Sequence, residues 1–273
     1  MGKFDGILIC TDLDGTLLGS DRKISGENLD AIEYFMSEGG FFTFITGRMP
    51  YFVSDIYGTI RPNAPFGCIN GGGIFDHRTQ KYLYTQELSH SALTLVEHVY
   101  QRMPEMGIQI NCFDKIYFSR ENSAMENFRK ITGMPNLVKH FDEVDEPLAK
   151  IVFGDERNDA IESLERLLRS HPDSKSFDLI RSEATLFEIL PKGICKGSVL
   201  PRLASILNVD MSKTVAVGDY NNDVSMLRTA GVGIAVANAC EEAKAAADII
   251  TVSNDEHAIR QIIYDIESGN IVL

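Results

Sequence analysis

The sequence predicts an α/β fold, a doubly wound core with a parallel sheet into which a smaller α+β domain is inserted. Two observations predict it. Short apolar strands alternate with amphipathic helices in about the first 70 residues and again after residue 196. Between these segments, hairpins mix with helices in an order that a parallel sheet does not use. The length of 273 residues suffices for both domains.

In the first segment, apolar runs flanked by polar residues predict strands, and apolar residues at helical spacing predict helices. Ser25 is suited to cap the first helix, which should end at Gly39. The rhythm of strand, helix and strand predicts right-handed crossovers and one parallel sheet. The expected elements are strands at 7–11, 41–46 and 66–70, helices at 25–38 and 50–59, and a hairpin at 74–84.

The middle segment has a different order of elements. Its expected elements are helices around 93–99, 121–131 and 161–168 and strands at 108–112, 116–119, 150–153, 177–180 and 186–190. After it the first rhythm returns, with a helix from 196 and strands at 214–218, 232–236 and 249–252. We therefore expect a core made of residues 1–84 and 191–273 and an inserted domain at 85–190.

Composition excludes several classes of protein. Lys and Arg number 26 against 39 Asp and Glu, a net charge of −13 that repels nucleic acids and anionic membranes. No run of about 18 apolar residues is present to span a membrane. The five cysteines are scattered and predict neither disulfides nor a zinc site. We expect a cytoplasmic protein, monomeric or a small homo-oligomer, with no nucleic-acid or membrane partner.

Carboxylates follow two of the expected strands directly. Asp12 and Asp14 come after the strand at 7–11, and Asp219 and Asp223 come after the strand at 214–218. Ligands of open parallel sheets bind beyond the carboxyl ends of the strands, and carboxylate oxygens suit Mg²⁺. Each pair taken alone has a plainer interpretation, since acidic residues are common in Asp-Gly turns and at helix N-termini.

Two further features could hold a phosphate group. Thr46, Gly47 and Arg48 follow the second strand and begin a helix, where a hydroxyl and free amides can bind an anion. Lys196 begins another helix. Taken singly, each feature has a plainer interpretation. The segment 46–48 could be an ordinary turn between a strand and a helix, and Lys196 could be a solvated surface lysine.

Taken together, these residues resemble the motifs of the haloacid dehalogenase (HAD) superfamily. The matching motifs are Asp-Leu-Asp-Gly-Thr-Leu-Leu at 12–18, Ile-Thr-Gly-Arg at 45–48, Asn-Gly at 70–71, Lys-Gly at 196–197 and Gly-Asp-Tyr-Asn-Asn-Asp at 218–223. Their order and spacing resemble the Cof-type branch of sugar-phosphate phosphatases. The resemblance implies a Rossmann-like, HAD-like core and an inserted α/β cap that reads the substrate.

The resemblance also implies roles for the carboxylates. Asp12 would be the nucleophile that forms an aspartyl-phosphate, and Asp14 the general acid and then the general base. Mg²⁺ would be held by Asp12, by the backbone carbonyl of Asp14 and by Asp219, with Asp223 close to the metal or its waters. The substrate would be a small phosphorylated metabolite, such as a hexose or pentose phosphate.

The remaining expected site residues would bind the phosphoryl group. The amides of Leu13 and Gly47 and the hydroxyl of Thr46 would hold its oxygens, and Lys196 would neutralise its charge. Asn222 would orient metal waters, Lys196 or the phosphoryl group. Two other activities remain open at this point, a phosphomutase using the same aspartyl-phosphate and a sugar-phosphate sensor without turnover.

Overall fold

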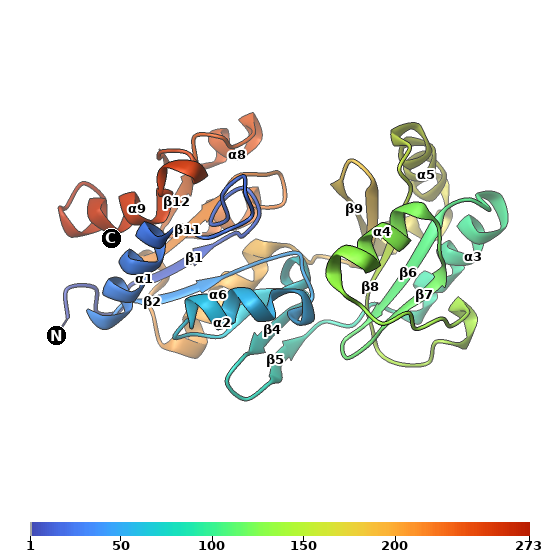
Figure 1. The fold of residues 1–273 in the computed structure, drawn as a ribbon, viewed down its shortest axis with the longest axis horizontal. Helices are drawn as coiled ribbons and strands as arrows, with labels where there is room; N and C mark the ends of the chain where they lie inside the picture. Colours follow the sequence, from blue (N-terminus) through green and yellow to red (C-terminus); the bar gives the residue numbers. More distant parts are fainter. Residues whose placement is uncertain (1) are drawn as a thin grey trace. The chain divides into compact units, whose positions relative to one another are not determined.

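The computed structural model describes residues 2–273. In it the chain divides into two compact units. The first, called the core unit here, comprises Met1–Thr85 and Cys195–Leu273, and the second, called the insert, comprises Gln86–Ile194. Figure 1 shows a mixture of strands and helices in each.

The core unit is built on a five-stranded sheet in which every strand is parallel to its neighbours. The order is β13-β12-β11-β1-β2. Its strands are β1 (Leu8–Thr11), β2 (Phe41–Phe44), β11 (Thr214–Gly218), β12 (Val232–Ala235) and β13 (Ile249–Ile250). From β1 the chain leads to β2 on one side, and from the central strand β11 it leads to β12 on the other. This reversal is the point at which doubly wound sheets bind ligands, and it confirms the predicted fold class.

Helices of the core unit pack in two groups, α1 with α9 and α7 with both α6 and α8. Their bounds are α1 (Gly26–Ser37), α2 (Ser54–Ile60), α6 (Lys196–Leu207), α7 (Val224–Thr229), α8 (Glu241–Ala246) and α9 (Ala258–Glu267). The Ser25 hydroxyl accepts a hydrogen bond from the amide of Asn28 at 3.2 Å and caps α1, as predicted.

One strand differs from the prediction. The segment 66–70 was expected as a third parallel strand, but β3 (Phe66–Cys68) pairs antiparallel with β4 (Gly73–Asp76), which pairs with β5 (Lys81–Thr85) in a three-stranded sheet. A single bridge between Ile45 and Gly67 is its parallel link to the main sheet. The reason lies just after β3, where Ile69 and Asn70 adopt positive φ and turn the chain into the hairpin.

The insert has its own five-stranded antiparallel sheet, in the order β7-β6-β8-β10-β9. Its elements are α3 (Leu93–Arg102), β6 (Gly107–Cys112), β7 (Ile116–Arg120), α4 (Ser123–Thr132), β8 (Leu148–Gly154), α5 (Asn158–Ser170), β9 (Phe177–Glu183) and β10 (Leu186–Pro191). Apolar residues of α3 and α5 form one core with one face of the sheet. The insert therefore has a hydrophobic core that is its own.

The unit boundaries differ slightly from the predicted ones at 84/85 and 190/191. They fall at 85/86 and 194/195. The second lies later because Pro191 still pairs with Phe177 between β10 and β9, and the Gly193 amide donates to Asp178 at 2.8 Å. These contacts attach the segment to the insert.

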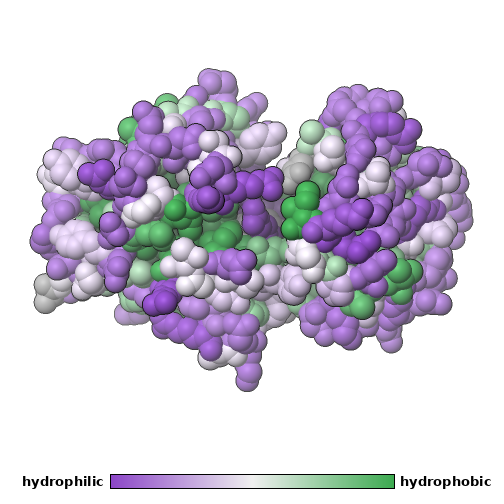
Figure 2. All heavy atoms as spheres, in the orientation of Figure 1, coloured by the Kyte–Doolittle hydropathy of each residue, from purple (hydrophilic) through white to green (hydrophobic). Residues whose placement is uncertain are grey.

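Hydrophilic side chains cover most of the surface of each unit on the face shown in Figure 2, with smaller apolar patches among them. Across residues 2–273, no helix combines the length and the apolar character needed to cross a bilayer.

Candidate active site

The candidate site lies at the carboxyl ends of three neighbouring strands of the core unit. Asp12 follows β1, Asp219 follows β11, and Thr46 lies two residues beyond β2. The amide of Asp12 donates to the carbonyl of Val217 at 2.8 Å, so the ladder between β1 and β11 continues to Asp12. Because these strands are adjacent and parallel, residues from three distant parts of the chain reach one edge of the sheet.

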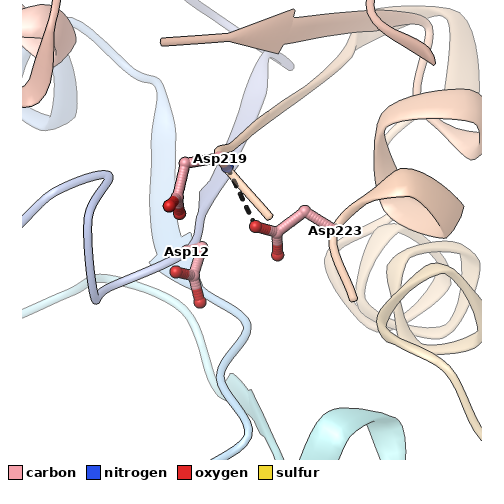
Figure 3. Close-up of side chains that lie close together, drawn as sticks. All are labelled: Asp12, Asp219 and Asp223. Carbon is pink, nitrogen blue, oxygen red and sulfur yellow. Dashed lines mark hydrogen bonds between the residues drawn. The ribbon is translucent and has the colours of Figure 1, made fainter. Parts of the chain in front are cut away.

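Three carboxylates converge at this edge. Asp12, Asp219 and Asp223 each place an oxygen within 4.8 Å of the others, and Figure 3 shows their side chains gathered around one point. Asp12 and Asp223 are buried, with 6% and 0% of their surface exposed. Like charges that are this close together and shielded from solvent repel strongly unless a positive charge is near.

Lys196 supplies part of that positive charge. Its Nζ donates to Oδ1 of Asp12 and to Oδ1 of Asp223, each at 2.5 Å. The side chain is 1% exposed, so the surface-lysine interpretation is wrong. A cation in the first turn of α6 is unfavourable to the helix dipole, which leaves the two carboxylates as the interactions that hold it there.

Burial dominates the ionisation of this cluster. It raises the pKa of Asp12 to about 8, against the opposing charge of Lys196, and raises the pKa of Asp219 to about 6. Burial by itself would lower the pKa of Lys196, but the facing carboxylates outweigh it and raise that pKa above its usual value. The lysine is therefore charged at neutral pH.

The cluster fits a divalent cation. Three ionised carboxylates and one ammonium leave two negative charges, which one divalent ion would neutralise. All the candidate ligands are hard oxygen donors of the kind that Mg²⁺ prefers, with no histidine or cysteine among them. Asp12, Asp219 and Asp223 are thus the residues that could hold the metal.

The loop after β11 is arranged by Asp223. Its Oδ2 accepts hydrogen bonds from the amides of Asp219 at 2.9 Å and Tyr220 at 3.0 Å, the first of which is dashed in Figure 3. Asp223 is the N-cap residue of α7, but its side chain makes no cap hydrogen bond to that helix. Thr16 holds the neighbouring carboxylate, since its hydroxyl donates to Oδ1 of Asp219 at 2.7 Å.

The loop after β1 requires a glycine. Gly15 has φ +80°, and a Cβ there would lie 2.6 Å from Oδ2 of Asp219. Leu13 is fully buried, and its carbonyl accepts the amide of Leu18 at 2.8 Å, which closes the loop. Asn238 supports it from the far segment, with Nδ2 donating to the Gly15 carbonyl at 2.8 Å.

Asp14 lies apart from the three converging carboxylates. Its side chain is 53% exposed and forms a two-point ion pair with the guanidinium of Arg48, in which Nε donates to Oδ2 at 2.9 Å. Arg48 therefore balances the negative charge of the Asp14 side chain. The expected metal contact of Asp14 was through its backbone carbonyl.

Three of the expected phosphate residues, Thr46, Gly47 and Asn222, lie around Asn70. Thr46 is buried, and its carbonyl accepts the amide of Asn70 at 3.0 Å. Asn70 Oδ1 accepts Nδ2 of Asn222 at 3.3 Å and lies 2.9 Å from where a Cβ of Gly47 would be. The asparagine pair thus ties the turn after β3 to the loop after β11, and Gly47 has to be small.

Sequence analysis did not assign four of these residues to the site. Arg48, Asn70 and Thr16 stood inside recognised motifs but were not among the expected site residues, while Asn238 was not singled out at all. Thr16 had a local signal, since it lies four residues after Asp12 in the same loop. Asn238 had none, because its partner Gly15 is 223 residues away.

Comparison with known proteins identifies a family. The haloacid dehalogenase-like hydrolases match the chain over residues 9–263. The chain is 28% identical over 270 residues to the putative phosphatase YxeH of Bacillus subtilis, covering 95% of this chain and 97% of that protein. It is 28% identical over 286 residues to the 5-amino-6-(5-phospho-D-ribitylamino)uracil phosphatase YwtE of the same organism, covering 96% and 98%. A crystal structure of a haloacid dehalogenase-like hydrolase from Bacteroides thetaiotaomicron is similar with TM-score 0.84 and 26% identity, covering 95% of this chain and 99% of that one.

Proposed function

This chain belongs to the haloacid dehalogenase-like hydrolases and is a phosphatase of that family, and from this premise we propose that it hydrolyses small phosphorylated metabolites through an aspartyl-phosphate on Asp12, with Mg²⁺ as cofactor. The observation that carries the proposal is the cluster of Asp12, Lys196, Asp223 and Asp219 at the strand ends. A buried carboxylate fixed by a buried ammonium is oriented as a nucleophile, since one oxygen is held and the other is left to react.

In the first step, Asp12 attacks phosphorus. A bond forms between its carboxylate oxygen and phosphorus while the bond from phosphorus to the ester oxygen breaks. Asp14, which takes up a proton once Arg48 has released it, gives that proton to the departing oxygen, so the leaving group departs as a neutral alcohol. Lys196 stays beside the nucleophile and stabilises negative charge on the transferring group.

In the second step, Asp14 takes a proton from water, and the water oxygen attacks phosphorus. The bond from phosphorus to Asp12 breaks and inorganic phosphate leaves, with Asp12 again a free carboxylate and Asp14 again protonated. Asp14 needs freedom to reach the leaving group, and its exposed side chain has that freedom once Arg48 releases it. A phosphate dianion is the natural competitor for Arg48, because a guanidinium binds both groups in the same two-point manner.

Asp12, Asp219 and Asp223, with the backbone carbonyl of Asp14, would hold the metal ion, with Asp223 acting directly or by orienting its water. When bound, Mg²⁺ supplies positive charge that lets an anionic nucleophile meet an anionic phosphate. This chain's own residues provide the rest. The hydroxyl of Thr46 and the amides of Leu13 and Gly47 would bind phosphoryl oxygens, with Asn222 placed by its bond to Asn70.

The substrate class follows from similarity and from the insert. One relative is named for a phosphoribityl compound, which carries a polyol beside its phosphate. We propose a sugar or polyol phosphate as substrate and propose that the insert acts as the cap that selects it. The cytoplasmic location and the small oligomeric state remain predictions from the sequence.

Phosphate release from a panel of phosphorylated metabolites tests the proposal, measured with Mg²⁺, with EDTA and with the Asp12→Asn protein alongside. We expect release that needs both Mg²⁺ and Asp12. Transfer of phosphate to a second hydroxyl of the same sugar, without release, would establish a phosphomutase. Binding without any phosphoryl transfer would establish a sensor, and either result would overturn the phosphatase proposal.

A further inference from the structure

Two segments of the core unit, one after β12 and one after β13, lie at the same edge of the sheet as the candidate active site. The sheet is parallel throughout, so the segments that follow its strands emerge at one edge. The first segment is 236–240, and the second is 251–256, which ends in a 3₁₀ turn at Asn254–Glu256. The amide of Ala237 donates to the carbonyl of Val252 at 3.2 Å, so the two segments are joined to each other.

The segment 236–240 is attached to the end of β11 and to the loop that follows it. The amide of Val236 donates to the carbonyl of Gly218 at 3.3 Å, and the amide of Cys240 donates to the carbonyl of Asp219 at 2.9 Å. Both ends of this short segment are therefore held beside Asp219. A residue between those ends has a position that is set relative to that carboxylate.

Asn238, in the middle of this segment, reaches the loop after β1. Its Nδ2 donates to the carbonyl of Gly15 at 2.8 Å, and its Oδ1 accepts the amide of Asn254 at 3.0 Å. These two bonds fix which end of the side-chain amide faces the loop, because a carbonyl accepts and a backbone amide donates. The side chain of Asn238 thus links the loop after β1 to the loop after β11, the two loops that bring carboxylates to the site.

Asn254 adds a second link to the loop after β1. Its Nδ2 donates to the carbonyl of Leu18 at 2.9 Å, and the adjacent Asp255 accepts the amide of Ser20 at 2.8 Å. The 3₁₀ turn that presents both side chains is closed by a capping box, which fixes its own backbone. The loop after β1 is therefore held from outside at three points, Gly15, Leu18 and Ser20.

The position of Gly15 matters to the metal cluster. A Cβ on Gly15 would lie 2.6 Å from Oδ2 of Asp219, so the glycine backbone already packs against that carboxylate. Asp14, whose backbone carbonyl is a proposed metal contact, directly precedes Gly15 in the chain. A shift of this loop would therefore displace one proposed metal ligand and change the packing against another.

The hydrogen bonds of Asn238 contribute little to the stability of the fold. Asn238 is exposed, and water can replace an exposed hydrogen bond at little cost in the free energy of unfolding. The site itself is more sensitive, since a misplacement of about 1 Å can lower a reaction rate about a hundredfold. The linkage through Asn238 therefore affects the geometry of the site more than the folding of the unit.

We propose that Asn238 and Asn254 are positioning residues, which set the spacing between the loops after β1 and β11 and thereby the affinity of the site for its divalent metal ion. The inference rests on the proposed function for the identity of that metal, Mg²⁺. The two asparagines act through the backbone of Gly15 and Leu18, and they are separate from the carboxylates and from the residues proposed to bind the phosphoryl group.

Calorimetric titration with Mg²⁺ alone, without substrate, tests the proposal. We expect Asn238→Ala to raise the Kd for Mg²⁺ by about tenfold, the usual order for removing a group that orients metal ligands. Asn254→Ala should raise it by a smaller factor, because the backbone amide of that residue still bonds to Asn238. The melting temperature of Asn238→Ala in EDTA should stay close to that of the wild type.

Asn270→Ala is the matched control. Asn270 is also exposed, and its Nδ2 also donates a hydrogen bond, to Oδ1 of Asp265 at 3.1 Å, but it lies beyond α9 and outside the two segments. We expect no change in the Kd for Mg²⁺ in this variant. A wild-type Kd in Asn238→Ala would overturn the inference. If the melting temperature of that variant also fell equally in Mg²⁺ and in EDTA, its asparagine would be shown to support only the fold.

Metal binding measured without turnover separates this inference from the proposed function. If the wild type bound Mg²⁺ but released no phosphate from any compound, the phosphatase proposal would fail and the Kd values would still decide the inference. Should Asn238→Ala not fold, the same titration of Asn254→Ala decides it. No binding of Mg²⁺ by the wild type at millimolar concentration would overturn the inference.

Discussion

The guanidinium of Arg48 holds the carboxylate of Asp14 in a two-point ion pair across 34 residues of sequence. This pair neutralises the residue proposed as general acid and base and fixes its direction before substrate binds. A substrate phosphate that draws Arg48 away would free Asp14 as the reaction begins. Arg48 would then connect phosphate binding to proton transfer.

Replacing Arg48 tests that connection. We expect Arg48→Met to raise KM by about tenfold because a contact to the substrate phosphate is lost, and to leave kcat nearly unchanged because Asp14 is already free of Arg48 in the reacting complex. Steady-state kinetics on the best substrate of the panel will measure both. Arg22→Met, at an exposed position of the same unit, should leave both constants unchanged. An unaltered KM in Arg48→Met would show that the arginine does not meet the phosphate.

Asp12→Asn should abolish turnover while the fold is retained. An amide is isosteric with the carboxylate but is not a nucleophile, and losing a catalytic nucleophile costs on the order of 10⁴-fold or more in kcat. Phosphate release and the circular dichroism spectrum measure the two effects, with the exposed Asp30→Asn as control. A variant that retained more than a few per cent of the wild-type rate would refute the assignment of Asp12.

Lys196→Ala should affect both rate and stability. The rate should fall on the order of 10²- to 10³-fold, as for the loss of one strong electrostatic donor. Removing the ammonium also leaves Asp12 and Asp223 buried without a counter-charge, which costs about 3–5 kcal/mol in broken buried pairs. Mg²⁺ should restore part of that stability. Lys192→Ala, at a side chain that is 61% exposed, should change neither property, and equal effects of the two variants would contradict the burial argument.

Magnesium should stabilise the protein more at pH 8 than at pH 6. Burial raises the pKa of Asp12 to about 8 and of Asp219 to about 6, above their unfolded values. The protonated forms therefore favour the folded state at low pH, and this stability is lost as pH rises through 6 and then 8 in metal-free protein. Mg²⁺ binds the ionised forms, so its affinity should rise over the same range with release of protons.

Thermal unfolding with Mg²⁺ and with EDTA at the two pH values measures this effect. At a hundred times the dissociation constant, the metal should add about 2.7 kcal/mol to the free energy of unfolding. Asp219→Asn should remove most of the difference between Mg²⁺ and EDTA. A Mg²⁺ effect of the same size at pH 6 and pH 8 would contradict the raised pKa values.

Much of the fold could be predicted because its signals are local. The runs at 7–11 and 214–218 are apolar, end in acidic residues and became β1 and β11. The helix N-cap at Ser25 and the hairpin after residue 73 likewise depend on residues that are neighbours in the sequence. The third strand was misplaced because its partner is chosen by the turn at Ile69 and Asn70, and a positive φ at isoleucine has no sequence signature.

The sequence by itself determined the fold class, the family and the motifs that follow the strands. It could do so because hydrophobic periodicity and motif spacing depend only on residues that are close together in the sequence. Only the tertiary structure decided what the charged groups contact. Lys196 could have been a surface lysine until the sheet order placed it against Asp12, 184 residues away, and Asp14 faces Arg48 instead of the three converging carboxylates. Charge pairing depends on distance and burial, and these are fixed by which strands lie side by side.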